Sequence, residues 1–279
     1  MKNILRFIVL IIVFIALLGM ACNLTRAINK PTETPTESPP TRTATPTLPV
    51  FDPPTEEGTS TPTPPANIPV VTSKQSEEIG QNPPFSIKIV KPILEGDSAA
   101  AAQFNAAVDQ LIAAQVESFK QSVQEGPNPS NLQSTSSIEI SYEEILILDE
   151  IISLRINIYT YLAEAAHPNQ STSSINEDLN QRKVLALADL FYPNAAYLPL
   201  ISAYCTHQVQ ESQVLENPDG AAATEENYRN WNITADGLLI TFDPYQVASY
   251  AAGPQTVMVP YYILKDLIRN DGPIARFNQ

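Results

Sequence analysis

The sequence predicts an α+β fold in which a mostly antiparallel sheet carries two main helices. From about residue 81 onward, strand-like alternation and helix-like periodicity occupy separate stretches instead of alternating as βαβ units. Two pairs of strand-like stretches are separated by short turn sequences, which is typical of antiparallel hairpins. We expect this domain to span residues 81–279, either as one unit or as two packed halves of about 81–150 and 151–279.

The first elements of the domain are a strand and a long helix. Residues 85–89 alternate apolar and polar side chains, and Pro92 is expected to end that strand. Asp97 or Ser98 can cap a helix that runs to about Val123, where a Gly-Pro-Asn-Pro segment follows. The core-facing side of this helix is expected to carry Phe104, Val108, Leu111, Ile112, Phe119 and Val123.

A hairpin is predicted next, from residues 138–148 and 151–162 with a turn at Asp149-Glu150. Its second strand alternates cleanly, so its two faces can be assigned. The inward side chains are expected to be Ile152, Leu154, Ile156 and Ile158, and the outward ones Ser153, Arg155, Asn157 and Tyr159.

The remaining elements are shorter. Pro199 suits the first turn of a second helix that runs to about Gln210 and buries Cys205 with Ile201 and Val209. The other predictions are strands at 173–179 and 184–187, a hairpin from 231–233 and 238–242, a strand at 255–259 and a short helix at 261–268.

The N-terminus resembles a bacterial lipoprotein signal. Lys2 and Arg6 precede an apolar run over 7–21, which is too short for an ordinary membrane-spanning helix, and Cys22 follows it. We expect residues 1–21 to be a signal peptide and Cys22 to be the lipid attachment site, although Gly19 stands where the family usually has leucine. An uncleaved signal anchor and ordinary secretion remain alternatives. The lipoprotein and the signal-anchor interpretations both place the rest of the chain on the extracytoplasmic face of the cell membrane.

A proline- and threonine-rich stretch follows the signal. Residues 31–65 contain 11 Pro and 11 Thr in 35 positions. Proline prevents helix formation, and such a composition buries too little apolar surface to fold. We therefore expect residues 22–80 to be a lipid anchor and a disordered stalk, with the domain at 81–279 as the extracellular part.

Composition and residue types narrow the function. The net charge of −14 argues against nucleic-acid binding, which needs clustered basic residues. Neither a glycine-rich phosphate loop nor metal-ligand spacing is present, so no cofactor or metal is expected. His207 lies two residues from Cys205 on the predicted helix and so cannot share its face, while His167 is expected to order a turn.

Acidic residues in the first hairpin leave one catalytic alternative open. Glu139, Glu143, Glu144, Asp149 and Glu150 could supply the paired carboxylates of a glycan hydrolase. They could equally be a solvated strand edge, where charges discourage unwanted strand pairing. We favour the second interpretation and expect a protein that is not an enzyme.

Four motifs resemble a known envelope family. They are AHPN at 166–169, LALADLF at 185–191, GLLITF at 237–242 and YQVASYAAGPQTVMVPY at 245–261. In order and spacing they resemble the extracytoplasmic, lysozyme-receptor domain of the anti-sigma factor RsiV, which also precedes the catalytic domain of the deacetylase PdaC. The resemblance covers roughly residues 83–270. It implies a binding or accessory module, and we expect the chain to present that domain alone on its stalk.

The best candidate binding segment is 243–254, which lies between two predicted strands. It carries Pro244, Tyr245, Tyr250, Gly253 and Pro254, and tyrosine combines a large contact area with a polar tip. Alternatively, the tyrosines pack against the sheet and Gly253 serves only the backbone. The predicted function is a lipid-anchored binding module for a basic protein such as lysozyme or for peptidoglycan glycan. A non-catalytic structural lipoprotein is the alternative.

Overall fold

A computed structural model describes residues 68–126 and 134–278, which all lie in one compact unit. Cys22, the signal peptide and most of the predicted stalk lie outside the described residues. The strands are β1 Val71–Gln81, β2 Pro84–Leu94, β3 Ser136–Ile147, β4 Ile151–Tyr161, β5 Asn169–Asp178, β6 Lys183–Val184, β7 Trp231–Ile233, β8 Gly237–Phe242 and β9 Gln255–Pro260. The α-helices are α2 Ala99–Glu125, α3 Tyr197–Glu211 and α4 Tyr261–Leu264.

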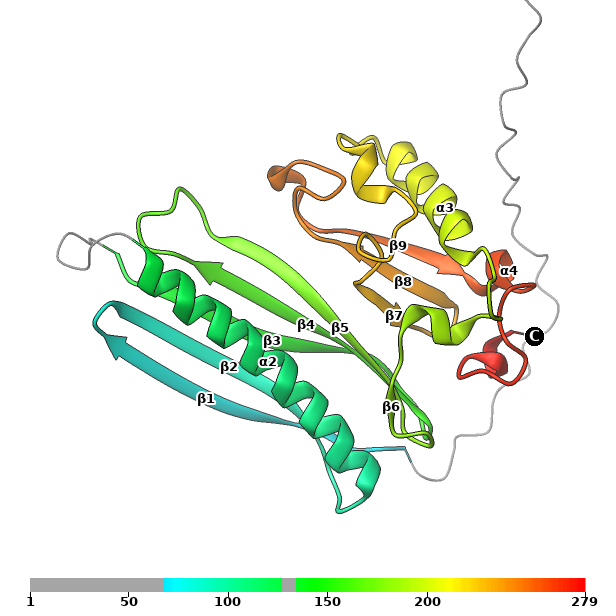
Figure 1. The fold of residues 1–279 in the computed structure, drawn as a ribbon, viewed down its shortest axis with the longest axis horizontal. Helices are drawn as coiled ribbons and strands as arrows, with labels where there is room; N and C mark the ends of the chain where they lie inside the picture. Colours follow the sequence, from blue (N-terminus) through cyan, green and yellow to red (C-terminus); the bar gives the residue numbers. More distant parts are fainter. Residues whose placement is uncertain (1–67, 127–133, 279) are drawn as a thin grey trace, which may run out of the picture. The chain divides into compact units, whose positions relative to one another are not determined.

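The fold is α+β and mostly antiparallel, as predicted, but it contains two sheets. The larger sheet has the order β1-β2-β3-β4-β5-β6, and the smaller one has the order β7-β8-β9. Within them only β2 and β3 pair in parallel, because α2 connects them as a crossover. Each main helix lies on its own sheet, α2 on the larger and α3 on the smaller (Figure 1).

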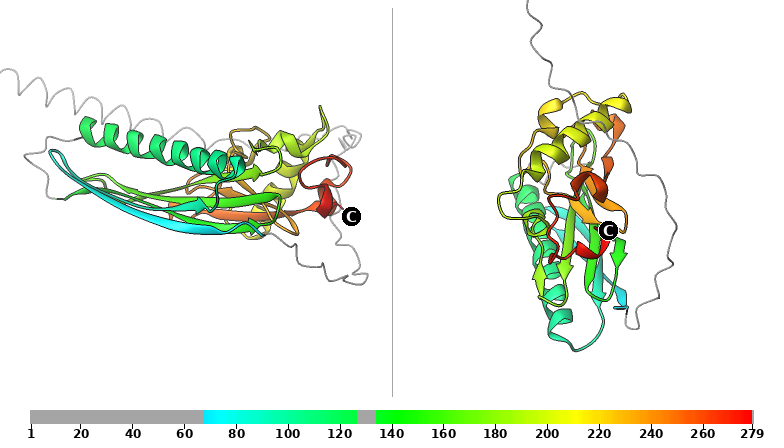
Figure 2. Two further views of the ribbon diagram at one scale, coloured as in Figure 1. Left: turned by 90° about the horizontal axis from the view of Figure 1, so that it is seen from below. Right: turned by 90° about the vertical axis from the view of Figure 1, so that its right-hand side faces the viewer.

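The helix α2 forms as its sequence predicts. The Ser98 side chain caps it by accepting a hydrogen bond from the Ala101 backbone N–H at 3.0 Å. The helix lies along one curved side of the larger sheet, as Figure 2 shows. Its apolar residues at helical spacing pack against that sheet. The residues buried on this face are Ala101, Phe104, Val108, Ile112, Phe119 and Val123.

The boundary predicted between stalk and domain at residue 80 is wrong. Val71–Gln81 forms strand β1, which pairs with β2 along its whole length. Its side chains are mostly polar and exposed, so it carries no apolar alternation from which a strand could be predicted. Pro92 also fails to end β2. β2 pairs with β3 only as far as Ile89, and proline is tolerated where one edge of a strand has no partner.

The β3–β4 hairpin turns at Asp149-Glu150, as predicted, and the four inward side chains of β4 are buried. Ser153, however, was expected to face solvent and is fully buried, because the smaller sheet covers that side of β4. Its hydroxyl donates to the Asn176 side chain and accepts from the Asn232 amide, at 2.7 and 2.9 Å. Buried polar groups paired in this way fix the position of one sheet on the other.

The domain has two apolar cores, and the boundary between them does not follow the predicted division into 81–150 and 151–279. Ile152 and Ile156 of β4 pack with α2, whereas Ile151 packs with α3 and the smaller sheet. A division of the domain at 150/151 would therefore cut the β3–β4 hairpin. The core between α3 and the smaller sheet buries Ile201, Cys205 and Val209, as predicted.

Some of the shorter elements differ from expectation. The predicted strand at 184–187 is the two-residue β6 followed by a 3-10 turn at Leu187–Leu190, and the final helix α4 ends at Leu264. Cys205 is a free cysteine, and burial raises the pKa of its thiol, which makes it a poor nucleophile. Within 68–126 and 134–278, no helix is long and apolar enough to cross a membrane.

Candidate functional site

The loop between β8 and β9 carries the predicted site residues and projects a tyrosine into solvent. The Tyr245 side chain is 57% exposed and its backbone has a φ of +69°, which is uncommon for a bulky residue. Tyr250 is half-buried and opens a 3-10 turn that ends at Gly253. Gly253 has a φ of +69°, which favours glycine, and free space where a Cβ would lie. Pro244 and Pro254 are partly exposed beside them.

Three rings from two loops form an aromatic cluster, which we define as His167, Tyr245 and Tyr250. The His167 ring lies 4.2 Å from the Tyr250 ring and 6.4 Å from the Tyr245 ring, measured between centroids. The two tyrosine rings are 5.5 Å apart. His167 comes from the β4–β5 connection, so the cluster joins the larger sheet to the smaller one.

Hydrogen bonds fix the orientation of these rings. The Tyr250 hydroxyl donates to the Pro168 carbonyl at 2.7 Å, and His167 Nδ1 lies 2.8 Å from the same oxygen. A carbonyl only accepts, so Nδ1 carries the proton in the neutral imidazole. Nε2 is then an acceptor, and the Tyr245 hydroxyl donates to it at 3.4 Å. The cluster therefore presents oriented rings and polar tips.

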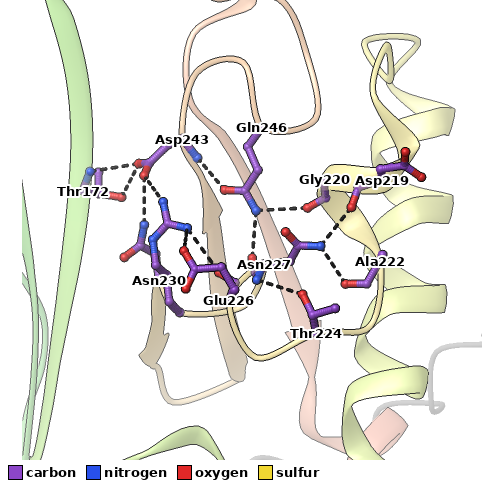
Figure 3. Close-up of polar contacts among 11 residues, drawn as sticks. Thr172, Asp219, Gly220, Ala222, Thr224, Glu226, Asn227, Asn230, Asp243 and Gln246 are labelled. Carbon is purple, nitrogen blue, oxygen red and sulfur yellow. Dashed lines mark hydrogen bonds and ion pairs between the residues drawn. The ribbon is translucent and has the colours of Figure 1, made fainter.

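A polar network holds the start of the loop in place (Figure 3). The Gln246 side chain donates to the Gly220 and Asn227 carbonyls at 3.0 and 2.8 Å, and it accepts from the Asp243 backbone N–H at 3.2 Å. Gly220 allows this approach, because a Cβ there would lie 1.6 Å from the Gln246 carbonyl oxygen. With Gln246 held inward, the adjacent Tyr245 is directed outward.

Asp243 ties the same loop to the larger sheet. One carboxylate oxygen accepts from the Thr172 backbone N–H and hydroxyl, each at 2.9 Å, as Figure 3 shows. The other accepts from Arg229 at 3.0 Å and from Asn230 at 3.2 Å. Charge-assisted bonds of this kind are stronger than neutral ones, so the loop is fixed at both ends of its first turn.

The acidic residues of the catalytic alternative lie elsewhere, and three of the five lie beside an arginine. Glu143 accepts from Arg155 at 2.5 Å, and Asp149 accepts from Arg276 at 3.0 Å. Glu150 lies 4.0 Å from the Arg276 guanidinium. Glu143, Asp149 and Glu150 thus each lie beside a guanidinium group, and Asp149 and Glu150 share that of Arg276.

The two tyrosines are predictable from the sequence as site residues, whereas His167 as their partner is not. The sequence predicts that His167 orders its turn, and the bond to Pro168 does so. The contact with Tyr245 joins residues 78 positions apart. Only the AHPN motif indicated that this loop belongs with the later motifs.

Residues 188–262 match the family model described as "Protein of unknown function (DUF3298)". The matched segment includes Gly220, Asn227, Asp243, Gln246 and both tyrosines, whereas His167 and Thr172 precede it. Over 139 residues, the chain is 24% identical to the peptidoglycan-N-acetylmuramic acid deacetylase PdaC of Bacillus subtilis, a match that covers 48% of this chain and 30% of that protein. Over 100 residues, it is 27% identical to the immunogenic protein MPT64 of Mycobacterium tuberculosis, covering 35% of this chain and 44% of the other.

Two solved structures share the fold. A DUF3298 family member from Bacteroides fragilis superposes with a TM-score of 0.52 at 16% identity, covering 76% of this chain and 97% of the other. One from Pseudomonas aeruginosa gives a TM-score of 0.53 at 16% identity, with coverages of 72% and 94%. The chain thus spans less than half the length of the two named sequence relatives but nearly the whole of these structures.

Proposed function

We propose that this chain is a lipid-anchored binding module on the extracytoplasmic face of a bacterial membrane, and that its aromatic cluster contacts a cell-wall glycan. The observation that carries the proposal is the exposure of Tyr245 on a loop that the polar network holds rigid. Rings ordered before binding lose little conformational entropy when a ligand arrives. In this role the protein binds and does not catalyse.

The chemistry of the rings and the similarity to PdaC favour a glycan over a basic protein as the ligand. Tyrosine and histidine rings offer flat apolar faces beside hydrogen-bonding tips, which suits a sugar ring with its apolar face and peripheral hydroxyls. The relative PdaC is named for action on peptidoglycan, and the motif resemblance to RsiV also points to the cell envelope.

A basic protein such as lysozyme is the second candidate. A segment beside the loop displays the acidic side chains Glu216, Asp219, Glu225 and Glu226, all exposed. Its backbone contacts the loop through the Glu216 N–H, which donates to the Val247 carbonyl at 2.9 Å. Acidic surface of this kind steers basic partners, and its effect weakens with salt.

We expect Tyr245→Ala to reduce retention of the full chain on insoluble peptidoglycan by about tenfold, because the variant loses the exposed ring. Tyr192→Ala is the matched control, since Tyr192 is a 42% exposed tyrosine outside the cluster. Sedimentation assays at low and high ionic strength measure retention, with immobilised lysozyme assayed in parallel.

The two candidate ligands differ in salt dependence. Glycan binding should change little with salt, whereas lysozyme binding should weaken as charges are screened over about 8–10 Å. If the parent is retained on neither peptidoglycan nor lysozyme, the result would favour a passive structural lipoprotein. Release of soluble sugar from peptidoglycan by the parent, lost in Glu143→Gln, would contradict the non-enzymatic role.

Membrane attachment is tested separately. We expect metabolic labelling with a fatty-acid probe to mark the parent and not Cys22→Ser, because the thiol of Cys22 is the proposed acceptor of the lipid. Fractionation should place the parent with membranes. Equal labelling of both proteins, or full release of the parent into the medium, would refute the anchor.

A further inference from the structure

A groove runs between the C-terminal half of α2 and the adjacent ends of β3, β4 and β5. We call it the α2 groove; it encloses about 310 Å³, which is within the range of small-molecule sites. A second hollow of about 250 Å³ extends it and shares Ser122, Leu162 and Ala165 with it. His167 lines the groove and its ring also packs against that of Tyr250, so the groove and the aromatic cluster adjoin at His167.

The lining of the α2 groove combines an apolar floor with neutral polar groups. Phe119, Ile138 and Ile158 come from the core beneath it. Hydroxyl and amide groups that can donate or accept hydrogen bonds surround this floor. They belong to Gln115, Ser118, Thr160, Asn169 and Ser171.

The α2 groove is poor in charged side chains, although the protein as a whole is acidic. Among the described residues that line it, none is Asp, Glu, Lys or Arg, although the chain carries a net charge of −14. The adjoining hollow adds Glu164 as its one charged side chain within the described residues. A charged ligand would lose hydration here without finding an opposite charge in the groove. A neutral ligand with many hydroxyls has a smaller desolvation cost, and the polar lining can offset that cost with hydrogen bonds.

We propose that the α2 groove binds an uncharged stretch of oligosaccharide, whose neighbouring units lie against the aromatic cluster. This inference rests on the proposed glycan-binding function and adds a second subsite and a charge preference to it. The neutral hydroxyl and amide lining replaces hydrogen bonds to water around the sugar, while the floor covers its apolar face. The acidic remainder of the protein then contributes little to affinity.

A matched pair of ligands tests the charge preference. Chitohexaose is neutral, and its fully N-deacetylated counterpart has the same length and linkage but carries ammonium groups below the pKa of its amines. By isothermal titration with the full chain in that pH range, we expect chitohexaose to bind about tenfold more tightly. If net acidity governed binding, the order would be reversed.

A bulky substitution at the rim of the groove tests its location. Ser118 is exposed on α2 and lines the groove, so Ser118→Trp should obstruct it without disturbing the core, and the affinity for chitohexaose should fall about tenfold. Ala113→Trp makes the same kind of change at an exposed position of α2 that does not line the groove, and it should bind as the parent does.

The outcomes separate this inference from the proposed function. Loss of binding in Ser118→Trp but not in Ala113→Trp, with preference for the neutral ligand, supports the groove. Unchanged binding in Ser118→Trp, together with loss in Tyr245→Ala, overturns the groove and leaves the aromatic cluster as the site. If chitohexaose does not bind the parent, or the charged ligand binds better, the inference fails, and peptidoglycan retention still decides the proposed function.

Discussion

Gly220→Ala is expected to lower the free energy of unfolding by about 3 kcal/mol and to release the site loop. The new methyl group would lie 1.6 Å from the Gln246 carbonyl oxygen, and that backbone atom has no rotamer into which it can move. The 3-10 turn at Pro218–Ala221 and the loop must therefore separate, with loss of the bonds from Gln246 to Gly220 and Asn227. Chemical denaturation measures the first effect, and peptidoglycan retention measures the second.

Gly126→Ala is the matched control for this substitution. Gly126 follows α2 at a negative φ, and a Cβ there would meet its nearest atom at 3.3 Å, so we expect a change below about 1 kcal/mol. Equal stability of Gly220→Ala and the parent would show that the loop and the turn are not in this close contact.

Glu177→Gln is expected to stabilise the protein at alkaline pH by about 2 kcal/mol, after allowance for solvent screening. Glu177 lies in β5 with its side chain buried, and neither carboxylate oxygen has a hydrogen-bond partner among the described residues. Burial and, to a smaller extent, the charge of Asp178 together raise the pKa of this carboxyl to about 7. Glutamine has the same shape without the charge.

The sign of the pH dependence follows from proton uptake. The unfolded chain releases the Glu177 proton near the ordinary glutamate pKa of about 4.5, whereas the folded protein keeps it until about 7. The parent should therefore lose stability as pH rises through this window and then level off. Glu177→Gln should lack this decline and match the parent near pH 4. Thermal unfolding across the pH range measures it.

The exposed Glu139→Gln is the control, and it should follow the parent at every pH. A parent whose stability rises between pH 4.5 and 7 by a step that Glu177→Gln removes would contradict the raised pKa. So would a Glu177→Gln variant that is less stable than the parent at pH 8.

Local patterns predicted the elements whose stabilising contacts are close in sequence. The helix α2 has its own cap and apolar stripe, and the β3–β4 hairpin has its own turn and alternation. Cys205 was correctly placed in a core because its helix repeats apolar residues at helical spacing. In these cases periodicity alone separates the buried face from the exposed one.

Contacts between the sheets could not be predicted in the same way. Ser153 is polar in an alternating strand and was assigned to solvent, because nothing local indicates that a second sheet covers it. Glu177 is buried for a similarly non-local reason, and β1 is a polar edge strand whose order comes from its partner. The aromatic cluster was predicted only in part, since His167 joins it across the interval between two loops.

The pairing of β1 with β2 has a mechanical consequence. Val71 of β1 pairs with Leu94, while Gln81 pairs with Pro84 at the opposite end of the sheet, the end that also holds Asn169 and the β4–β5 connection. The chain that precedes Val71 therefore joins the sheet at the end away from His167. A pull between that chain and a ligand held at the aromatic cluster would load β1 along its axis. All eleven residue pairs with β2 would then resist together in shear, and they would not open one after another. If the chain and the ligand pulled on the same end of the sheet, the pairs would separate one at a time. Because they pull on opposite ends, the domain can stay folded under a larger force.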